Sequence, residues 1–369
     1  MPPISFDRLK SLIPEQALVR IQALLPSKME LPGKVSEPVR VLACDFGASK
    51  IILLEALKYE GRVTVERFDL MAHPEDPGKA AQLIKETLKK GYLSSRVRVS
   101  VKGQSVIVRF VQFPKMKPEE LKSAITYEAE NYIPFKLDEV VLDYTILEEA
   151  AGPNQDMMNV LLIAVKKEEI FPLIKEFQDA ELQVELIDID TLASINALEF
   201  LYPEEFKSSV ALLDLGRDVS GLSVIREGKP RFIRDLSFGG IDIQKRLRRK
   251  LGMSLQDAEK IIAHTTEASP EALLVLKESY ETLCADLKVT LDYYQSQMPD
   301  SNPVEHFFLS GGAGDPRQMA ETLAASLGVT VQGIEVAARV TLAETVDKVF
   351  FEKNQRLLAV ALGLCLRRP

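Results

Sequence analysis

Two stretches of this 369-residue chain repeat one pattern, and the repeat constrains the fold more than any other feature of the sequence. In each copy an apolar run ends in Asp-x-Gly, a second apolar run follows, and a Glu-Gly turn leads into a third. The first copy carries Asp45 and Gly47, and the second carries Asp214 and Gly216. Short apolar runs separated by glycine turns predict β-hairpins. Because the two aspartates are 169 residues apart, the repeat indicates a duplicated architecture and not a solenoid.

Glycine-bearing turns of this chain carry groups that suit an anionic ligand. After Asp45, backbone N–H groups can hold a phosphate and the carboxylate can hold a hydrated cation. Taken alone, this turn is better explained as a plain hairpin. A third turn, Gly311-Gly312-Ala313, follows an apolar run and leads into a helix that we expect to begin at Asp315 and Pro316. It favours an anion near its free N–H groups, although a plain β–α connection explains it equally well.

The composition narrows the class of protein. With 46% hydrophobic and 27% charged residues, it is that of a globular protein with a sizeable core. The net charge of −8 argues against general nucleic-acid binding, which favours a basic surface. Cysteines and histidines are scattered, so we expect reduced thiols and no zinc site. The N-terminus lacks a signal peptide, and the apolar run from Leu357 to Leu366 is too short to span a bilayer. We therefore expect a soluble cytoplasmic protein that works at a membrane only through a partner.

The order of the three turns, DFGAS, DLGRDVS and SGGAG, resembles the phosphate-1, phosphate-2 and adenosine pattern of the actin-like ATPase superfamily. Further motifs resemble the PilM family of type IV pilus assembly proteins, over about residues 40–367. These motifs are the strand Ser105 to Arg109, the helix that ends in Tyr132-Ile-Pro-Phe135, Phe238-Gly-Gly240, Ala258-Glu259 and Leu291 to Ser296.

The resemblance implies an α/β, actin-like fold. Two lobes of duplicated, ribonuclease H-like architecture would close over a nucleotide, and the first lobe would carry an inserted subdomain where FtsA carries its own. The expected division is 1–38 for an N-terminal extension, 39–102 and 182–208 for the first lobe, 103–181 for the inserted subdomain, and 209–369 for the second lobe with its adenosine-binding turn. We interpret the extension as a loosely docked arm, with an amphipathic docking segment as the alternative.

The resemblance also implies ATP and Mg²⁺ as ligands. Asp45 and Asp214 would hold Mg²⁺ through water, no residue is assigned a catalytic role, and ATP hydrolysis is expected to be weak or absent. The residues assigned to the nucleotide are Asp45, Gly47, Ala48, Ser49, Lys50, Asp214, Gly216, Ser220, Gly239, Gly240, Glu259, Gly311, Gly312 and Ala313.

Three departures from the family pattern bear on ATP binding. Ile52 occupies the position of a lysine that is usual after the first turn, and Lys50 lies two residues before it, on the same side of the predicted strand. Ile262 occupies the position of a second usual lysine. The second turn carries Arg217 and Asp218 where small residues are usual. The loss of two lysines weakens the expectation of tight ATP binding.

PilM-like proteins hold the short cytoplasmic N-terminal tail of the inner-membrane protein PilN, between the first lobe and the inserted subdomain. The resemblance therefore implies a PilN-like partner, and a place at the inner face of the inner membrane through that partner. It implies neither nucleic-acid binding nor direct membrane insertion, and the oligomeric state stays open. The residues assigned to the tail are Tyr127, Tyr132, Ile133, Pro134 and Phe135.

Other functions stay open at this point. A small-molecule kinase of the actin superfamily would need a general base near the phosphates, and the sequence offers no clear one. A filament-forming FtsA-like protein usually ends in an amphipathic membrane helix, which we do not expect before Pro369. The cytoplasmic part of the type II secretion protein GspL is a closer rival, but it normally continues into a transmembrane span.

Overall fold

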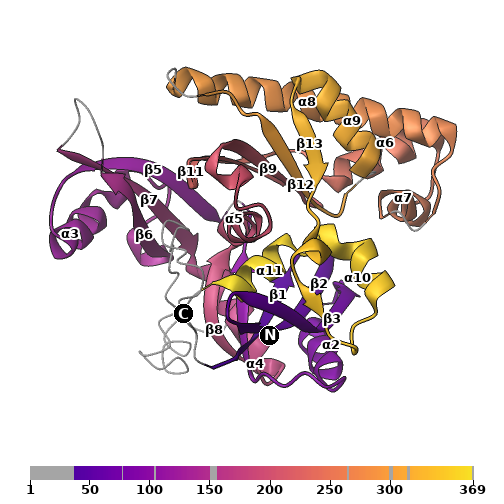
Figure 1. Cartoon of the computed structure of the whole chain (residues 1–369), viewed down its shortest axis with the longest axis horizontal. Coiled ribbons are helices and arrows are strands. Elements are labelled where there is room, and N and C mark those ends of the chain that lie inside the picture. Colours follow the sequence, from indigo (N-terminus) through magenta and orange to yellow (C-terminus); the bar gives the residue numbers. More distant parts are fainter. Residues whose placement is uncertain are drawn as a thin grey trace.

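The structure is a computed structural model that describes residues 37–76, 78–103, 105–149, 156–263, 266–298, 302–313 and 316–367. Nearly all of the predicted extension, and the predicted cap at Asp315, lie outside these described residues. Within these residues the fold is α/β and is built on three sheets (Figure 1).

The first sheet has six strands in the order β14-β3-β2-β1-β4-β8. Strand β1 pairs antiparallel with β2 and parallel with β4, which itself pairs parallel with β8. The strands are β1 (Val39–Phe46), β2 (Lys50–Tyr59), β3 (Arg62–Ala72), β4 (Arg96–Val101), β8 (Gln183–Ile189) and β14 (Thr341–Leu342).

The second sheet has five strands in the order β11-β10-β9-β12-β13, and it repeats the plan of the first. Its strand β9 pairs antiparallel with β10 and parallel with β12. The duplicated hairpins predicted from Asp45 and Asp214 are therefore confirmed as β1–β2–β3 and β9–β10–β11. The strands are β9 (Ser209–Leu215), β10 (Ser220–Arg226), β11 (Lys229–Leu236), β12 (His306–Gly311) and β13 (Thr330–Gly333).

Helices α6 to α9 gather around the second sheet, whereas α5 and α11 lie at the centre of the molecule (Figure 1). Helix α8 is the longest of the described helices, and it begins at a proline behind the cap Ser269. The helices are α2 (Lys79–Leu88), α3 (Pro118–Glu128), α4 (Lys167–Asp179), α5 (Asp190–Leu201), α6 (Gly240–Leu251), α7 (Leu255–Ile262), α8 (Pro270–Gln297), α9 (Pro316–Leu327), α10 (Lys348–Asn354) and α11 (Ala359–Leu366). Among the described helices, none is both long and apolar enough to cross a membrane.

The end of the chain returns to the first sheet. We expected residues 209–369 to form the second lobe, but β14 pairs with β3, and α11 shares the hydrophobic core of β1 and β2. The reason is that α11 is apolar on all sides, with every residue from Ala359 to Cys365 buried. Its packing against α5 is close: a Cβ at Gly363 would lie 1.7 Å from the carbonyl oxygen of Ala193. Only glycine permits this approach.

A three-stranded sheet, in the order β5-β7-β6, lies beside the first sheet and is covered by α3 (Figure 1). It has its own small core, formed by residues such as Leu121, Ile133 and Val160. We expected the inserted subdomain to reach residue 181, but the buried side chains of α4 join the core of the first sheet. The strands are β5 (Val106–Pro114), β6 (Val140–Glu149) and β7 (Met157–Lys166).

Candidate functional site

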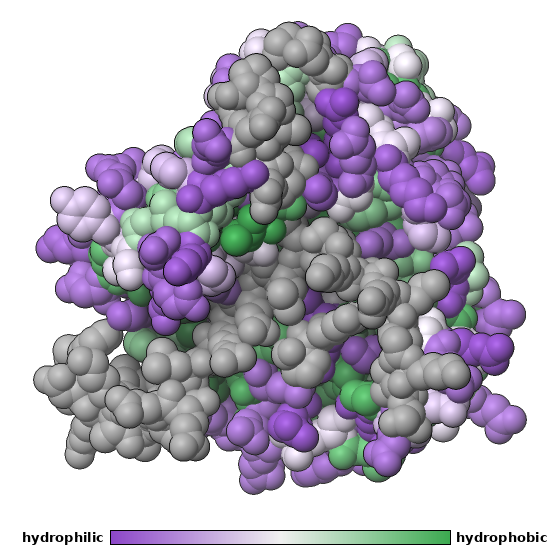
Figure 2. Space-filling view, turned by 60° about the vertical axis from the view of Figure 1, so that its left-hand side comes forward, coloured by the Kyte–Doolittle hydropathy of each residue, from purple (hydrophilic) through white to green (hydrophobic). Residues whose placement is uncertain are grey.

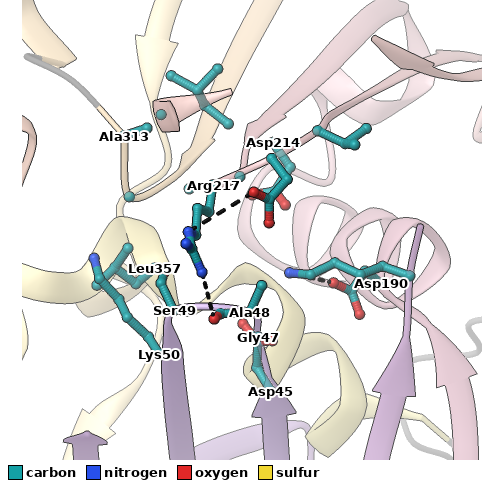
Figure 3. A pocket seen from close by; sticks show the side chains of 18 of the residues that line it. Asp45, Gly47, Ala48, Ser49, Lys50, Asp190, Asp214, Arg217, Ala313 and Leu357 are labelled. Atoms are coloured by element: carbon teal, nitrogen blue, oxygen red, sulfur yellow. Dashed lines mark hydrogen bonds and ion pairs between the residues drawn. The ribbon is translucent and has the colours of Figure 1, made fainter. Parts of the chain in front are cut away.

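A cavity of about 740 Å³ lies between the first and second sheets, where the three glycine-bearing turns meet (Figure 3). This volume is within the range of about 300–1,000 Å³ that is usual for cofactor sites. Twelve of the residues that we assigned to a nucleotide line it. They are Asp45, Gly47, Ala48, Ser49, Lys50, Asp214, Gly216, Gly240, Glu259, Gly311, Gly312 and Ala313.

The sheet topology explains why these residues meet. In open α/β sheets a ligand binds beyond the carboxyl ends of parallel strands, and β1, β4 and β8 all end at the cavity. Lys102 directly follows β4, and Asp190 directly follows β8; both line the cavity. Our sequence reasoning missed these two residues. Their position immediately after a predicted strand was the signal that could have found them.

Two carboxylates of the cavity, those of Asp45 and Asp214, are held away from water. Loss of hydration is the main cause that raises the pKa of Asp45 to about 7; Asp190 and Asp214 raise it further, and Lys102 opposes them. The pKa of Asp214 is raised by the same loss of hydration. Oδ1 of Asp45 is buried and has no hydrogen-bond partner among the described residues. This acceptor fits a hydrated cation, which can donate a hydrogen bond from its water.

Lys102 and Asp190 form an ion pair inside the cavity, with Nζ 3.1 Å from Oδ2. Asp190 is the main cause that raises the pKa of Lys102, so its ammonium stays charged beside Asp45 and Asp214. Among the described residues, no group of three or more His, Cys, Asp or Glu side chains is arranged to hold a metal ion. A cation held through water, as the sequence suggested, needs no such group.

Lys50 does not take the position of the lysine that the family pattern places at Ile52. It lines the cavity, but its Nζ would lie only 2.8 Å from a Cβ at Gly312, so the side chain reaches the Gly-Gly turn. Figure 3 shows it directed toward Leu357 and away from Asp214. Its pKa is lowered by burial and by the nearby charge of Arg356. Ile52 is buried at the wall of the cavity.

Two residues that we assigned to the nucleotide support the second turn without lining the cavity. The Ser220 hydroxyl is fully buried and donates to the carbonyl oxygen of Phe238, at 2.6 Å. Gly239 packs behind the turn, where a Cβ would lie 2.4 Å from the carbonyl oxygen of Arg217. We therefore propose Ser220 and Gly239 as supports of the turn, and the other twelve residues as ligand contacts.

The first turn is braced by its own backbone and by β3. The N–H of Gly47 donates to the carbonyl oxygen of Lys50, at 2.9 Å. The ring of His73, just after β3, contacts the Gly47 carbonyl through Nδ1 at 2.7 Å and packs edge-on against Phe46. The N–H of His73 donates to the Ser49 carbonyl, at 2.9 Å. A turn fixed in this way can present its free N–H groups to a ligand in one geometry.

The residues that we assigned to a partner lie at the end of α3 and directly after it. These five described residues do not line the cavity. Ile133 is buried in the small core, and Tyr132 and Phe135 pack against that core. Tyr127 is 83% exposed and Pro134 is also exposed. The segment thus divides into side chains that hold the subdomain together and side chains that a partner can reach. In the view of Figure 2, the described surface of the molecule is mostly hydrophilic, with smaller hydrophobic areas.

Comparison with known proteins agrees with this arrangement. A family model described as type IV pilus assembly protein PilM matches residues 44–369. A solved structure of a "PilM-PilN type IV pilus biogenesis complex" has a chain with 26% sequence identity and a TM-score of 0.79, over 90% of this chain and 99% of that one. The ethanolamine utilization protein EutJ from Carboxydothermus hydrogenoformans has 16% identity and a TM-score of 0.54, over 98% of this chain and 96% of that one, which shows a shared fold.

Proposed function

This chain belongs to the family of the type IV pilus assembly protein PilM and has its actin-like fold, and on that premise we propose that it is a nucleotide-dependent scaffold. It binds Mg–ATP between a first lobe built on the six-stranded sheet and a second lobe built on the five-stranded sheet. It also binds the N-terminal tail of a PilN-like membrane protein, which holds it at the inner face of the inner membrane.

The observation that carries the nucleotide proposal is the meeting of three turns at one cavity. Asp45 and Asp214 end equivalent strands of the two sheets, and the Gly311-Gly312 turn completes the same wall. Each Asp-x-Gly turn offers N–H groups for phosphates and a carboxylate for the water shell of a cation. The buried Oδ1 of Asp45, which has no hydrogen-bond partner among the described residues, supports such a cation.

The charge around the cavity explains why Mg²⁺ belongs in the proposal. Three lysine or arginine residues line the described part of the cavity, against seven aspartate or glutamate residues. A polyphosphate brought into this acidic cavity would be repelled unless a cation accompanied it. Mg²⁺ prefers to keep several waters and to be bound by carboxylates together with phosphates. The seven acidic residues are Asp45, Glu75, Asp190, Asp214, Asp218, Asp235 and Glu259.

The partner proposal rests on the similar chain whose structure is described as a complex with PilN. In the present chain, Tyr127 and Pro134 offer exposed apolar surface at the end of α3. Aromatic residues at such positions supply much of the contact energy of protein interfaces. The buried neighbour Ile133 holds this segment in place.

Nucleotide occupancy can be tested on the full chain as it is purified. The protein is denatured, and the small molecules that it releases are identified by chromatography and mass spectrometry. We expect an adenine nucleotide from the wild type and none from the Asp214→Ala variant. A protein that releases no nucleotide and acquires none after incubation with Mg–ATP would exclude the nucleotide proposal.

A further inference from the structure

One side chain crosses the cavity between the two Asp-x-Gly turns. Arg217 lies in the second turn, and its Nη1 donates to the carbonyl oxygen of Ala48 in the first turn, at 3.2 Å. Figure 3 shows the side chain reaching from its own turn down to Ala48 and Ser49. The guanidinium is half-exposed at the cavity, with 51% of the side chain accessible. A ligand that lies between the two turns would meet it.

The backbone beneath this side chain is fixed. The carbonyl oxygen of Arg217 accepts a hydrogen bond from the N–H of Ile241, at 2.8 Å, and that of Gly216 accepts one from Gly240, at 3.0 Å. Both donors belong to the first turn of α6. The glycine at position 239 lets this helix approach so closely. Arg217 is therefore a flexible side chain on a rigid base, which suits repeated binding of a ligand in one orientation.

The other two cationic side chains at the cavity are engaged elsewhere. Lys102 is paired with Asp190, and it lies beside Asp45 and Asp214. Lys50 reaches the Gly-Gly turn. Of the lysine and arginine residues that line the described cavity, Arg217 is the one whose side chain donates a hydrogen bond from one Asp-x-Gly turn to the other.

We propose that Arg217 binds the polyphosphate of the nucleotide and supplies the positive charge that a lysine at position 52 would otherwise provide. This assignment rests on the proposed function. A guanidinium has five N–H donors in a planar fork, and one hydrogen bond to Ala48 leaves donors for phosphate oxygens. Asp218 forms an ion pair with Arg217, but its carboxylate is 3.9 Å from Nε, which is too long for a hydrogen bond. Because Arg217 and Ala48 lie in hairpin turns of different sheets, a phosphate bound here contacts both halves of the molecule at once.

The proposal is tested by calorimetric titration of the full chain with adenosine, ADP and ATP, the nucleotides in the presence of Mg²⁺. The variants are Arg217→Ala and Arg217→Lys. Arg249→Ala serves as a matched control, because Arg249 is exposed on α6 and does not line the cavity. Arg217→Ala should weaken ADP and ATP by about tenfold to a hundredfold, the effect expected for charge-assisted hydrogen bonds, and leave adenosine unchanged. Arg217→Lys should recover part of the loss, because it keeps the charge but not the fork.

Each alternative outcome has a distinct meaning. If the wild type binds the nucleotides and Arg217→Ala binds them within twofold as well, the assignment of Arg217 is overturned and the proposed function stands. Equal losses for adenosine, ADP and ATP also overturn it, because the side chain would then only hold the two turns together. A wild type that binds none of the three ligands contradicts the proposed function itself.

Discussion

Asp45 combines two properties: it belongs to a glycine turn, and its carboxylate is desolvated. Water is excluded from its Oδ1, and the carboxylates of Asp190 and Asp214 lie near it. These neighbours favour the protonated form, whereas Lys102 favours the ionised form. A cation in the cavity would relieve the repulsion among the three carboxylates. The buried carboxylate of Asp45 therefore lowers the stability of the folded protein, but it suits the binding of a ligand.

This cost predicts a pH dependence that the Asp45→Asn variant should remove. The pKa of Asp45 is about 7 in the folded protein, above the ordinary aspartate value of 3.8, so the folded state keeps the proton that the unfolded state releases. Folding stability is thus lost as the pH rises from about 4 through 7. In buffer with a chelator, Asp45→Asn should melt at a higher temperature than the wild type, and this difference should be larger at pH 8 than at pH 5 by the equivalent of about 1–3 kcal/mol. Thermal unfolding at both pH values measures this.

The control for this experiment is Asp257→Asn, which neutralises a carboxylate that lies outside the cavity lining. It should not reproduce the rise in melting temperature at pH 8. If the melting temperatures of Asp45→Asn and the wild type differ by the same amount at pH 5 and at pH 8, ionisation of Asp45 is not the cause of that difference.

At the scale of elements, the crossing of α5 and α11 joins the end of the chain to the strands that form the site. Helix α5 begins at Asp190, which lines the cavity, and α11 packs against it along a fully apolar surface. Past α11, Arg367 pairs with the buried Asp188 of β8, with Nε 2.7 Å from Oδ2. The position of Asp190 therefore depends on how these two helices fit together.

We predict that Gly363→Ala destabilises the protein, because the new Cβ would overlap the carbonyl oxygen of Ala193 and force the helices apart. Overpacking of this kind costs about 1–3 kcal/mol, or more where backbone must move. Chemical denaturation monitored by circular dichroism measures the loss. Gly333→Ala is the matched control, since a Cβ there meets nothing within 4 Å. Equal stability of the two variants would show that the crossing tolerates a wider separation.

For the end of α3 and the segment that follows it, we predict that stability and partner binding depend on different side chains. Tyr127→Ala should leave the melting temperature nearly unchanged, because the side chain is exposed, and should weaken binding of a peptide with the sequence of a PilN-like tail. Ile133→Ala should lower the free energy of unfolding by about 2–4 kcal/mol, because it opens a cavity in the small core. Fluorescence anisotropy with a labelled peptide measures binding. Unchanged peptide affinity in Tyr127→Ala would remove this surface from the partner proposal.

At the scale of the whole molecule, the predictions from the sequence were most accurate for features that depend on local sequence alone. The hairpins at Asp45 and Asp214 repeat because each is a local unit with its own turn, and the actin-like fold that the family resemblance implied is confirmed. The return of α11 to the first sheet was not predictable, because nothing in the sequence of an apolar helix indicates which core it enters.

Lys102 and Asp190 were missed because their meeting depends on the pairing of β4 with β8. Lys50 lines the cavity as predicted, but its side chain is directed toward Leu357, which the sequence did not indicate.

The claim that the two halves form one nucleotide site is tested most directly by calorimetric titration of the full chain with Mg–ATP. Asp45→Ala and Asp214→Ala remove equivalent carboxylates from opposite halves, and Asp257→Ala removes one outside the site. We predict that the wild type and Asp257→Ala bind one Mg–ATP per chain, and that each of the other two variants loses binding although it remains folded. Binding that survives both single substitutions, or that is absent from the folded wild type, would contradict the account.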